Sequence, residues 1–123
     1  MILLDTSVWV DHLRRGDPLV VQALESGQVV AHTFVIGELA CGNLKSRARV
    51  IELLRDLPQS AIATDDEVLH FIDGHKLMGR GIGYVDAHLL AAAAIGRSFL
   101  WTKDRRLREV AIELGFAYLK ESR

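Results

Sequence analysis

Four acidic residues, Asp5, Glu38, Asp86 and Asp104, have surroundings that fit chemistry better than surface charge. Asp5 and Asp104 each come shortly after an apolar run, as residues beyond the end of a buried strand do. Glu38 and Asp86 share helical spacings of three and four with mainly apolar residues, so both are predicted to face inward. Burying an unpaired carboxylate costs on the order of several kcal/mol, and something must therefore compensate these acids.

An arginine partner, a raised pKa that keeps the acid neutral, or a metal ion can compensate a buried carboxylate. The helix faces of Glu38 and Asp86 carry no obvious arginine. Four carboxylates at one sheet edge would repel one another, and Mg²⁺ or Mn²⁺ relieves that repulsion because these ions prefer oxygen ligands. Such an ion activates a water molecule and neutralises charge that grows on a phosphate. We therefore expect one pocket in which the four acids hold divalent metal to cut a phosphodiester bond.

Two hydroxyl residues, Ser7 and Thr102, stand close in sequence to Asp5 and Asp104 and are candidate supporting residues. They could orient a carboxylate or a metal-bound water. The structural alternative stays open, because acids and hydroxyls also cap helices and turns. Capping explains Asp104 almost as well as a site does.

The elements that must position these residues alternate between short strands and helices. Strands are expected at 1–4, 28–31, 61–63, 98–101 and 116–118. Helices are expected at about 6–15, 18–26, 33–42, 46–57, 64–78, 84–95 and 104–114. This alternation predicts an α/β fold with a parallel sheet covered on both faces. Ligands of such folds bind beyond the carboxyl ends of the strands, where Asp5 and Asp104 are expected.

Length and composition favour one domain over residues 1–123, large enough to bury a core without disulfides. The formal net charge is −1, so charge alone does not indicate nucleic-acid binding. Cys41 is the single cysteine, which excludes an intrachain disulfide and a cysteine-built zinc site and fits a cytoplasmic protein. The start of the chain does not resemble a signal peptide, and the longest apolar run, 89–95, is too short to span a membrane. The five histidines show no zinc-type spacing with the cysteine and are predicted to be structural or to lie at the surface.

The motifs at residues 3–7, 35–39, 86–93 and 102–107 resemble, in order, the four conserved motifs of PIN-domain ribonucleases. The short chain looks most like the VapC toxins of type II toxin–antitoxin systems. That resemblance implies a three-layer α/β/α fold with a five-stranded parallel sheet in the order 3-2-1-4-5. It also implies an endoribonuclease that uses Mg²⁺, with Mn²⁺ as a substitute, a homodimer, and a cognate antitoxin that blocks the acidic site. The helix at 46–57 has more apolar residues than one core face needs, which makes it a candidate dimer surface.

Two other functions fit parts of the pattern. A catalytically weak or inactive PIN-like module that only binds a partner would keep nearly the same sequence. A phosphatase of the aspartyl-phosphate kind also places an aspartate after its first strand, but it usually carries a second one two residues later, where this chain has Ser7. Metal binding separates the first alternative from the enzyme, and an acid-labile phosphoryl-enzyme would reveal the second.

Overall fold

The computed structural model describes residues 1–119, and residues 120–123 of the predicted domain lie outside the described part. Within residues 1–119 the strands are β1 (Ile2–Leu4), β2 (Val29–Val30) and β3 (Phe99–Trp101). The helices of the same range are α1 (Thr6–Arg15), α2 (Pro18–Glu25), α3 (Thr33–Ala40), α4 (Arg47–Asp56), α5 (Asp65–His75), α6 (Tyr84–Gly96) and α7 (Arg105–Leu114).

The three strands form a parallel sheet in the order β2-β1-β3. Ile2 pairs with Val29 on one side and with Phe99 on the other. Single parallel bridges extend the sheet outward, one beyond β2 at Gln59 and one beyond β3 at Ala117. The three strands and the two outer bridges follow the predicted spatial order, but each outer strand is reduced to one bridge.

The predicted strand at 61–63 is wrong, because the chain pairs with β2 earlier and only briefly. The Ala31 N–H donates to the Pro58 carbonyl (2.9 Å), and the Ser60 N–H donates to the Ala31 carbonyl (2.7 Å). Pro58 has no N–H of its own with which to extend the ladder. Ala63 instead packs against α5 and α6, in a small cluster that includes Val68.

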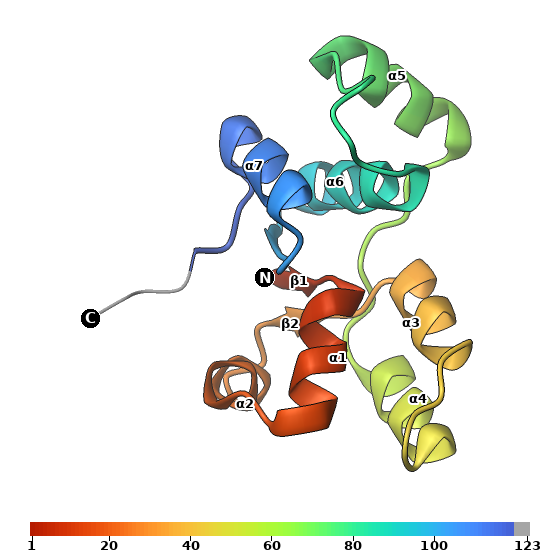
Figure 1. Ribbon diagram of the computed structural model, residues 1–123, viewed down its shortest axis with the longest axis vertical. Helices are drawn as coiled ribbons and strands as arrows, with labels where there is room; N and C mark the ends of the chain where they lie inside the picture. The colour runs from red at the N-terminus through yellow and green to blue at the C-terminus, as the bar shows by residue number, and fades with distance from the viewer. Residues whose placement is uncertain (120–123) are drawn as a thin grey trace.

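Helices cover both faces of the sheet, as predicted. Figure 1 shows α6 and α7 on one side and α1 and α2 on the other, with α5 packed on α6 and α3 beside α4. The main core lies between these layers; among its completely buried side chains are Leu3, Leu4, Leu89, Leu90 and Leu107. No helix within residues 1–119 is long and apolar enough to cross a membrane.

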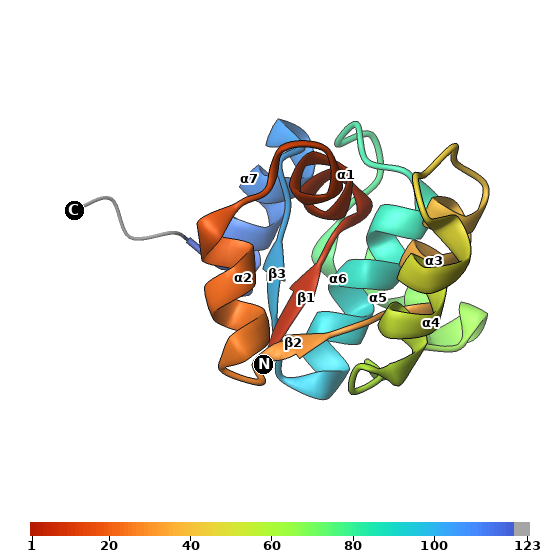
Figure 2. The same ribbon diagram turned by 90° about the horizontal axis from the view of Figure 1, so that it is seen from below.

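The carboxyl ends of β1 and β3 lie side by side at one edge of the sheet (Figure 2). The Asp5 N–H donates to the carbonyl of Trp101, the last residue of β3 (2.9 Å). Both chains then turn into helices, β1 into α1 and β3, after a short loop, into α7. The residues that follow the two strands are thereby brought together, although almost a hundred positions separate them in the sequence.

Candidate active site

Asp5 is the most firmly held of the four candidate acids. Its Oδ1 atom accepts a hydrogen bond from the Thr6 N–H (2.7 Å), so it caps α1 as the structural alternative proposed. Its Oδ2 atom accepts from the hydroxyls of Ser7 (2.9 Å) and Thr102 (2.7 Å). The residue is only 8% exposed. Capping and a site role are therefore compatible, because separate donors fix the two oxygens of one carboxylate.

Ser7 and Thr102 connect the two strand ends. The Thr102 hydroxyl donates to Asp5 and accepts from the Asp104 N–H (3.0 Å). The Ser7 hydroxyl likewise donates to Asp5 and accepts from the Lys103 N–H (3.0 Å). Each hydroxyl thus uses both its donor and its acceptor capacity. The prediction that these two residues orient a carboxylate agrees with this geometry.

Asp104 begins α7. Its Oδ1 atom accepts from the Leu107 N–H (3.0 Å), which is ordinary N-capping. The residue is exposed, and within residues 1–119 nothing donates a hydrogen bond to its Oδ2 atom. Asp104 therefore has one oxygen fixed by the helix and one oxygen free for a ligand.

Glu38 does not face inward, and that prediction is wrong. The side chain is exposed, since its turn of α3 lies at the surface while Val35 and Leu39 point into the core. Its Oε1 atom accepts a hydrogen bond from the Thr6 hydroxyl (2.5 Å). Glu38 thus needs no buried counter-charge, but a contact from the residue next to Asp5 turns it toward the strand ends. No local sequence pattern reveals this contact, because it joins α1 to α3.

Asp86 connects the four acids electrostatically. It is partly buried near the start of α6, and its Oδ2 atom accepts from the Gly83 N–H (3.0 Å). Burial raises the pKa of this carboxyl, and the negative charges of Asp5, Asp104 and Glu38 raise it further, against the lowering effect of the Gly83 N–H. Asp5, Glu38 and Asp104 are therefore close enough to Asp86 to influence its pKa, although the four acids come from four separate segments of the chain.

The donor set is one of hard oxygens, from four carboxylates and two hydroxyls. It matches the preferences of Mg²⁺ and Mn²⁺ rather than those of zinc. Within residues 1–119, no group of three or more acidic, histidine or cysteine side chains is arranged so that it could hold a metal ion. An open arrangement still fits Mg²⁺, which keeps several waters and needs only one or two direct carboxylate ligands. The residues present thus fit a hydrated divalent ion.

A pocket of about 550 Å³ adjoins Glu38 between α1 and α3. Apolar side chains of Val10, Leu13, Leu39 and Leu44 line part of it. Arg14 and Lys45 contribute positive charge, and Thr6 and Glu38 form its side toward the acids. The pocket therefore offers apolar and basic contacts next to an acidic centre.

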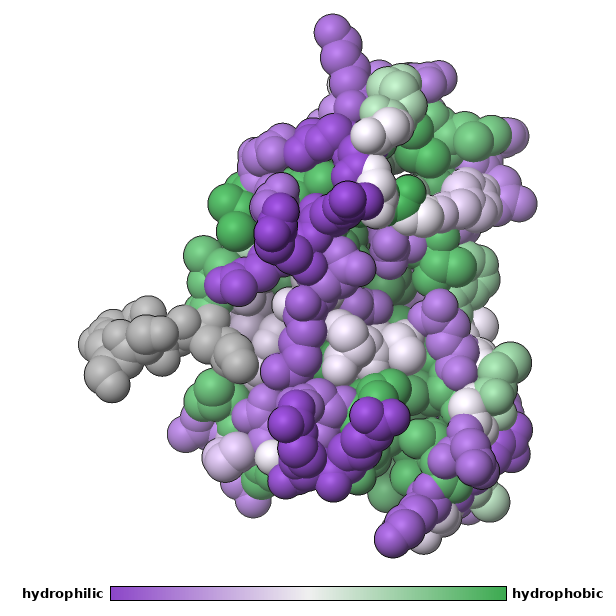
Figure 3. Space-filling view, in the orientation of Figure 1, coloured by the Kyte–Doolittle hydropathy of each residue, from purple (hydrophilic) through white to green (hydrophobic). Residues whose placement is uncertain are grey.

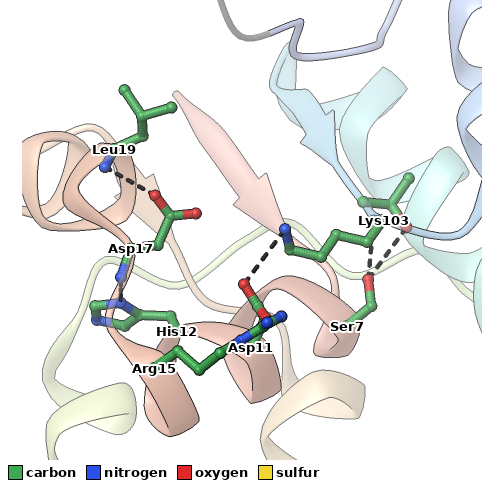
Figure 4. Close-up of polar contacts among 8 residues, drawn as sticks. Ser7, Asp11, His12, Arg15, Asp17, Leu19 and Lys103 are labelled. Carbon is green, nitrogen blue, oxygen red and sulfur yellow. Dashed lines mark hydrogen bonds and ion pairs between the residues drawn. The ribbon is translucent and has the colours of Figure 1, made fainter.

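Lys103 links the β3–α7 connection to α1. Its Nζ atom lies 3.4 Å from Asp11 Oδ2, and its backbone N–H donates to Ser7 (Figure 4). Asp11 also accepts from Arg15, and these contacts hold the pKa of Asp11 below its usual range, that of Arg15 most strongly. Asp11 is thus occupied in a structural ion pair and does not join the four acids. Sequence inspection missed this contact, because only the fold brings α1 and the connection together.

Two of the five histidines are structural, as predicted. His32 caps α3 by accepting the Phe34 N–H on Nδ1 (3.0 Å). His88 lies 3.2 Å from Asp65 through Nε2. Both rings are buried and both contact the Phe34 ring, with centroid distances of 5.3 Å for His32 and 4.6 Å for His88. They therefore join α3 to α6, the helices that carry Glu38 and Asp86.

Comparison with known proteins identifies the family. A profile of the PIN domain matches residues 2–113. Ribonuclease VapC32, found in two strains of Mycobacterium tuberculosis, is 45% identical over 122 residues, which is 98% of this chain and 98% of the relative. The crystal structure of PAE2754 from Pyrobaculum aerophilum superposes with a TM-score of 0.60 over 89% of this chain and 78% of that one. Its 17% sequence identity supports the fold alone. The chain therefore belongs to the PIN domain family and, within it, to the VapC-type proteins.

Proposed function

We propose that this protein is the toxin of a type II toxin–antitoxin pair, an endoribonuclease that cleaves RNA with a divalent metal ion. The observation that carries the proposal is the position of Asp86, whose carboxyl is influenced by Asp5, Glu38 and Asp104 at once. The name of the relative, a VapC ribonuclease, supports RNA as the substrate. Mg²⁺ is the proposed ion and Mn²⁺ its substitute.

The proposed chemistry is hydrolysis of a phosphodiester bond, in which a water oxygen attacks phosphorus and one ribose oxygen leaves. A bound divalent ion lowers the pKa of water and neutralises charge that grows on the phosphate. Asp5, Glu38, Asp86 and Asp104 would hold it. Ser7 and Thr102 keep the Asp5 carboxylate in one orientation, Thr6 does the same for Glu38, and the Gly83 N–H does so for Asp86. Catalysis by charge stabilisation depends on such preorganised groups.

An antitoxin and a second copy of the chain are the proposed protein partners, in the cytoplasm. The apolar and basic pocket beside Glu38 supports a protein partner at the acidic site. Leu53 on α4 is 48% exposed, which supports this helix as the dimer surface. The alternative, a module that binds its partner without cleaving RNA, requires that the four acids hold no metal.

RNA cleavage tests the enzyme directly. Purified protein is incubated with RNA and Mg²⁺ or Mn²⁺, as wild type and as the Asp5→Asn, Asp86→Asn and Asp73→Asn variants. We expect Asp5→Asn and Asp86→Asn each to lower the rate by about 100-fold or more, because each removes a charge that the reaction requires. Asp73→Asn is the matched control, since Asp73 is exposed and outside the four acids. Equal rates in all four proteins would refute the proposal.

A further inference from the structure

Arg106 lies over the backbone of the loop that leads into α6. A Cβ atom built on Gly81 would stand 2.6 Å from both Cδ and Nη1 of Arg106, and 3.1 Å from its Nε. Contacts under about 3.0 Å do not occur for real Cβ atoms, so only glycine leaves room for the arginine in this position. Gly81 also has a φ of +81°, which other residues rarely adopt. The guanidinium group of Arg106 is thereby seated on the surface of this loop.

Within residues 1–119, the side chain of Arg106 forms no hydrogen bond or ion pair, unlike three cations close to it in the sequence or beside Gly81. Arg105 pairs with Glu109 (3.3 Å), Arg80 with Glu113 (2.6 Å) and Lys103 with Asp11 (3.4 Å). Arg106 also stands in the first turn of α7, which contains no acidic residue and where the helix dipole disfavours positive charge; Asp104 precedes this turn as the N-cap. Because no side chain of the described residues pairs with it, the Arg106 guanidinium group is available to a ligand.

The side chain of Arg106 connects two segments of the chain that carry the acids. It follows Asp104 by two residues, within the same helical turn. Its seat, Gly81, precedes Gly83 by two residues, and the Gly83 N–H is the hydrogen-bond donor to Asp86. The side chain therefore reaches from one acid-bearing segment to another. Figure 3 shows that hydrophilic residues also gather over α7 on this face of the molecule.

The loop itself is anchored to α7. Arg80 donates to Glu113 through two parallel hydrogen bonds, Nη1 to Oε1 (3.1 Å) and Nη2 to Oε2 (2.6 Å). Bidentate pairing of this kind fixes orientation as well as distance. Gly81 is the next residue in the chain, so the surface on which Arg106 rests is held against the helix that carries Arg106.

We propose that Arg106 binds a phosphate of the RNA strand next to the four acids, and that Gly81 is the positioning residue that keeps its guanidinium group in place. The planar guanidinium group matches the geometry of phosphate oxygens and donates to two of them at once. A stem resting on the backbone loses less conformational freedom on binding than a free one. This inference rests on the proposed function and adds a substrate contact to it.

The test measures the Kd for a fluorescent single-stranded RNA in EDTA at low salt, and KM and kcat for cleavage with Mn²⁺. Arg106→Ala is expected to raise Kd and KM by about 10- to 100-fold, the effect of losing a charge-assisted contact, with a smaller change in kcat. It should also reduce the slope of log affinity against log salt by about 0.7, the value for one phosphate of a single strand. Arg106→Lys keeps the charge without the planar group and should recover only part of the affinity. Arg105→Ala is the charge control, because Arg105 already has a partner in Glu109.

The glycine pair supplies a second control. Gly81→Ala should displace Arg106 and raise Kd and KM by about tenfold. Gly79→Ala introduces a Cβ at a similar φ, +73°, but that Cβ meets nothing within 4 Å, so its effect should be under about twofold. In the Arg106→Ala background, Gly81→Ala should raise Kd and KM no more than Gly79→Ala does. The reason is that Gly81→Ala and Arg106→Ala act through the same contact.

The outcomes separate the two proposals. If wild type cleaves RNA but Arg106→Ala behaves like Arg105→Ala, or Gly81→Ala like Gly79→Ala, the inference is wrong and the proposed function stands. If wild type neither binds nor cleaves RNA, the proposed function fails and the inference with it. Melting curves confirm that each variant is folded; Arg106 is exposed, so its replacement should not prevent folding.

Discussion

Asp5 and Asp86 differ in their hydrogen bonds and in their electrostatic surroundings, although both belong to the four candidate acids. Three hydrogen bonds satisfy Asp5, from Thr6, Ser7 and Thr102. Asp86 receives one, from Gly83, and faces the charges of the three other acids. Asp5 is therefore held in one orientation by three donors, whereas burial and the three other acids raise the pKa of Asp86.

Thr102 tests the role of the hydrogen bonds around Asp5. Thr102→Val keeps the shape of the side chain but removes the donor to Asp5 and the acceptor for the Asp104 N–H. We expect a loss of about 1–3 kcal/mol in the free energy of unfolding, because the groups left unpaired are buried or partly buried. Mn²⁺ affinity should fall by about 10- to 100-fold, as is usual when a residue that orients a metal ligand is replaced. Urea unfolding and calorimetry measure the two effects. Thr33→Val is the control, since Thr33 is exposed and its hydroxyl makes no hydrogen bond within residues 1–119.

Asp86 should destabilise the metal-free protein at neutral pH. Its pKa is raised in the fold, by burial first and by the other acids next, so its ionised form is the disfavoured one. The contribution of Asp86 to the free energy of unfolding is therefore greatest at pH values below 3.8, the pKa of an unperturbed aspartate. This contribution is lost as pH rises through the raised pKa of the folded protein. In EDTA at pH 7, Asp86→Asn should unfold at higher urea than wild type, by about 1 kcal/mol or less after solvent screening. The difference should vanish at low pH. Asp73→Asn should show no such pH-dependent gain, and a wild type that is the more stable protein at pH 7 would contradict this account.

Residue types and spacing were enough to nominate all four acids, but not to say how each is held. The strand-end positions of Asp5 and Asp104 were correct because strand periodicity and parallel pairing fix them locally. The prediction that Glu38 faces inward was wrong. Apolar neighbours at helical spacing do not show which turns of a short helix are exposed to solvent. The contacts Thr6–Glu38 and Arg106–Gly81 join separate elements, so the spacing of residues along the chain cannot predict them.

At the scale of elements, α3 and α6 meet through buried histidines. His32 and His88 pack on either side of Phe34, with Tyr84 against His88 at a centroid distance of 4.7 Å. Within residues 1–119, His32 Nε2 and His88 Nδ1 are buried without a hydrogen-bond partner. This contact joins the helices that carry Glu38 and Asp86, and both imidazole rings are buried.

Because His32 is buried, we expect the protein to lose stability on acidification at pH values higher than those at which carboxylates titrate. Burial first, and the nearby His88 second, lower the pKa of His32 from 6.5 to about 4. The unfolded chain therefore binds a proton that the folded chain rejects between these two pH values. The part of the free energy of unfolding that depends on His32 is fully present above pH 6.5. It falls by about 2–4 kcal/mol as pH drops toward 4. Urea unfolding at several pH values measures it.

His32→Asn is the informative variant, because asparagine can still cap α3 while it lacks the titrating ring. It should lower stability at pH 7 through lost packing, yet flatten the decline between pH 6.5 and 4. His70→Asn is the control, since His70 is exposed. The same decline in His32→Asn as in wild type would show that His32 is not its source.

Helix boundaries followed closely from the sequence, while the outer strands did not. The helix predicted from residue 64 begins with a capping box between Thr64 and Glu67, closed by hydrogen bonds of 2.8 and 3.1 Å. Caps are local and use a few neighbouring residues, so short sequence patterns determine them. A strand at a sheet edge depends on a partner elsewhere, and the pairing at Gln59 ends after one bridge.

At the scale of the whole molecule, the fold brings acids from three other segments close enough to Asp86 to raise its pKa. Expression of the protein alone should accordingly arrest growth of a bacterial host if it is a ribonuclease toxin, and Asp5→Asn should relieve the arrest. Colony counts and RNA integrity measure the effect, with immunoblots to confirm equal amounts of both proteins. Normal growth with abundant, folded wild-type protein would contradict the toxin role while leaving the fold unchallenged.

The central claim is that Asp5, Glu38, Asp86 and Asp104 form one site for a divalent ion. Calorimetric titration with Mn²⁺ tests it most directly, using wild type, Asp5→Asn, Glu38→Gln, Asp86→Asn, Asp104→Asn and the control Asp73→Asn. We predict that wild type and Asp73→Asn bind Mn²⁺ equally, and that each of the other four variants binds it at least about tenfold more weakly. No heat of binding in folded wild type, or the same affinity in all six proteins, would contradict the account and favour a module that only binds a partner.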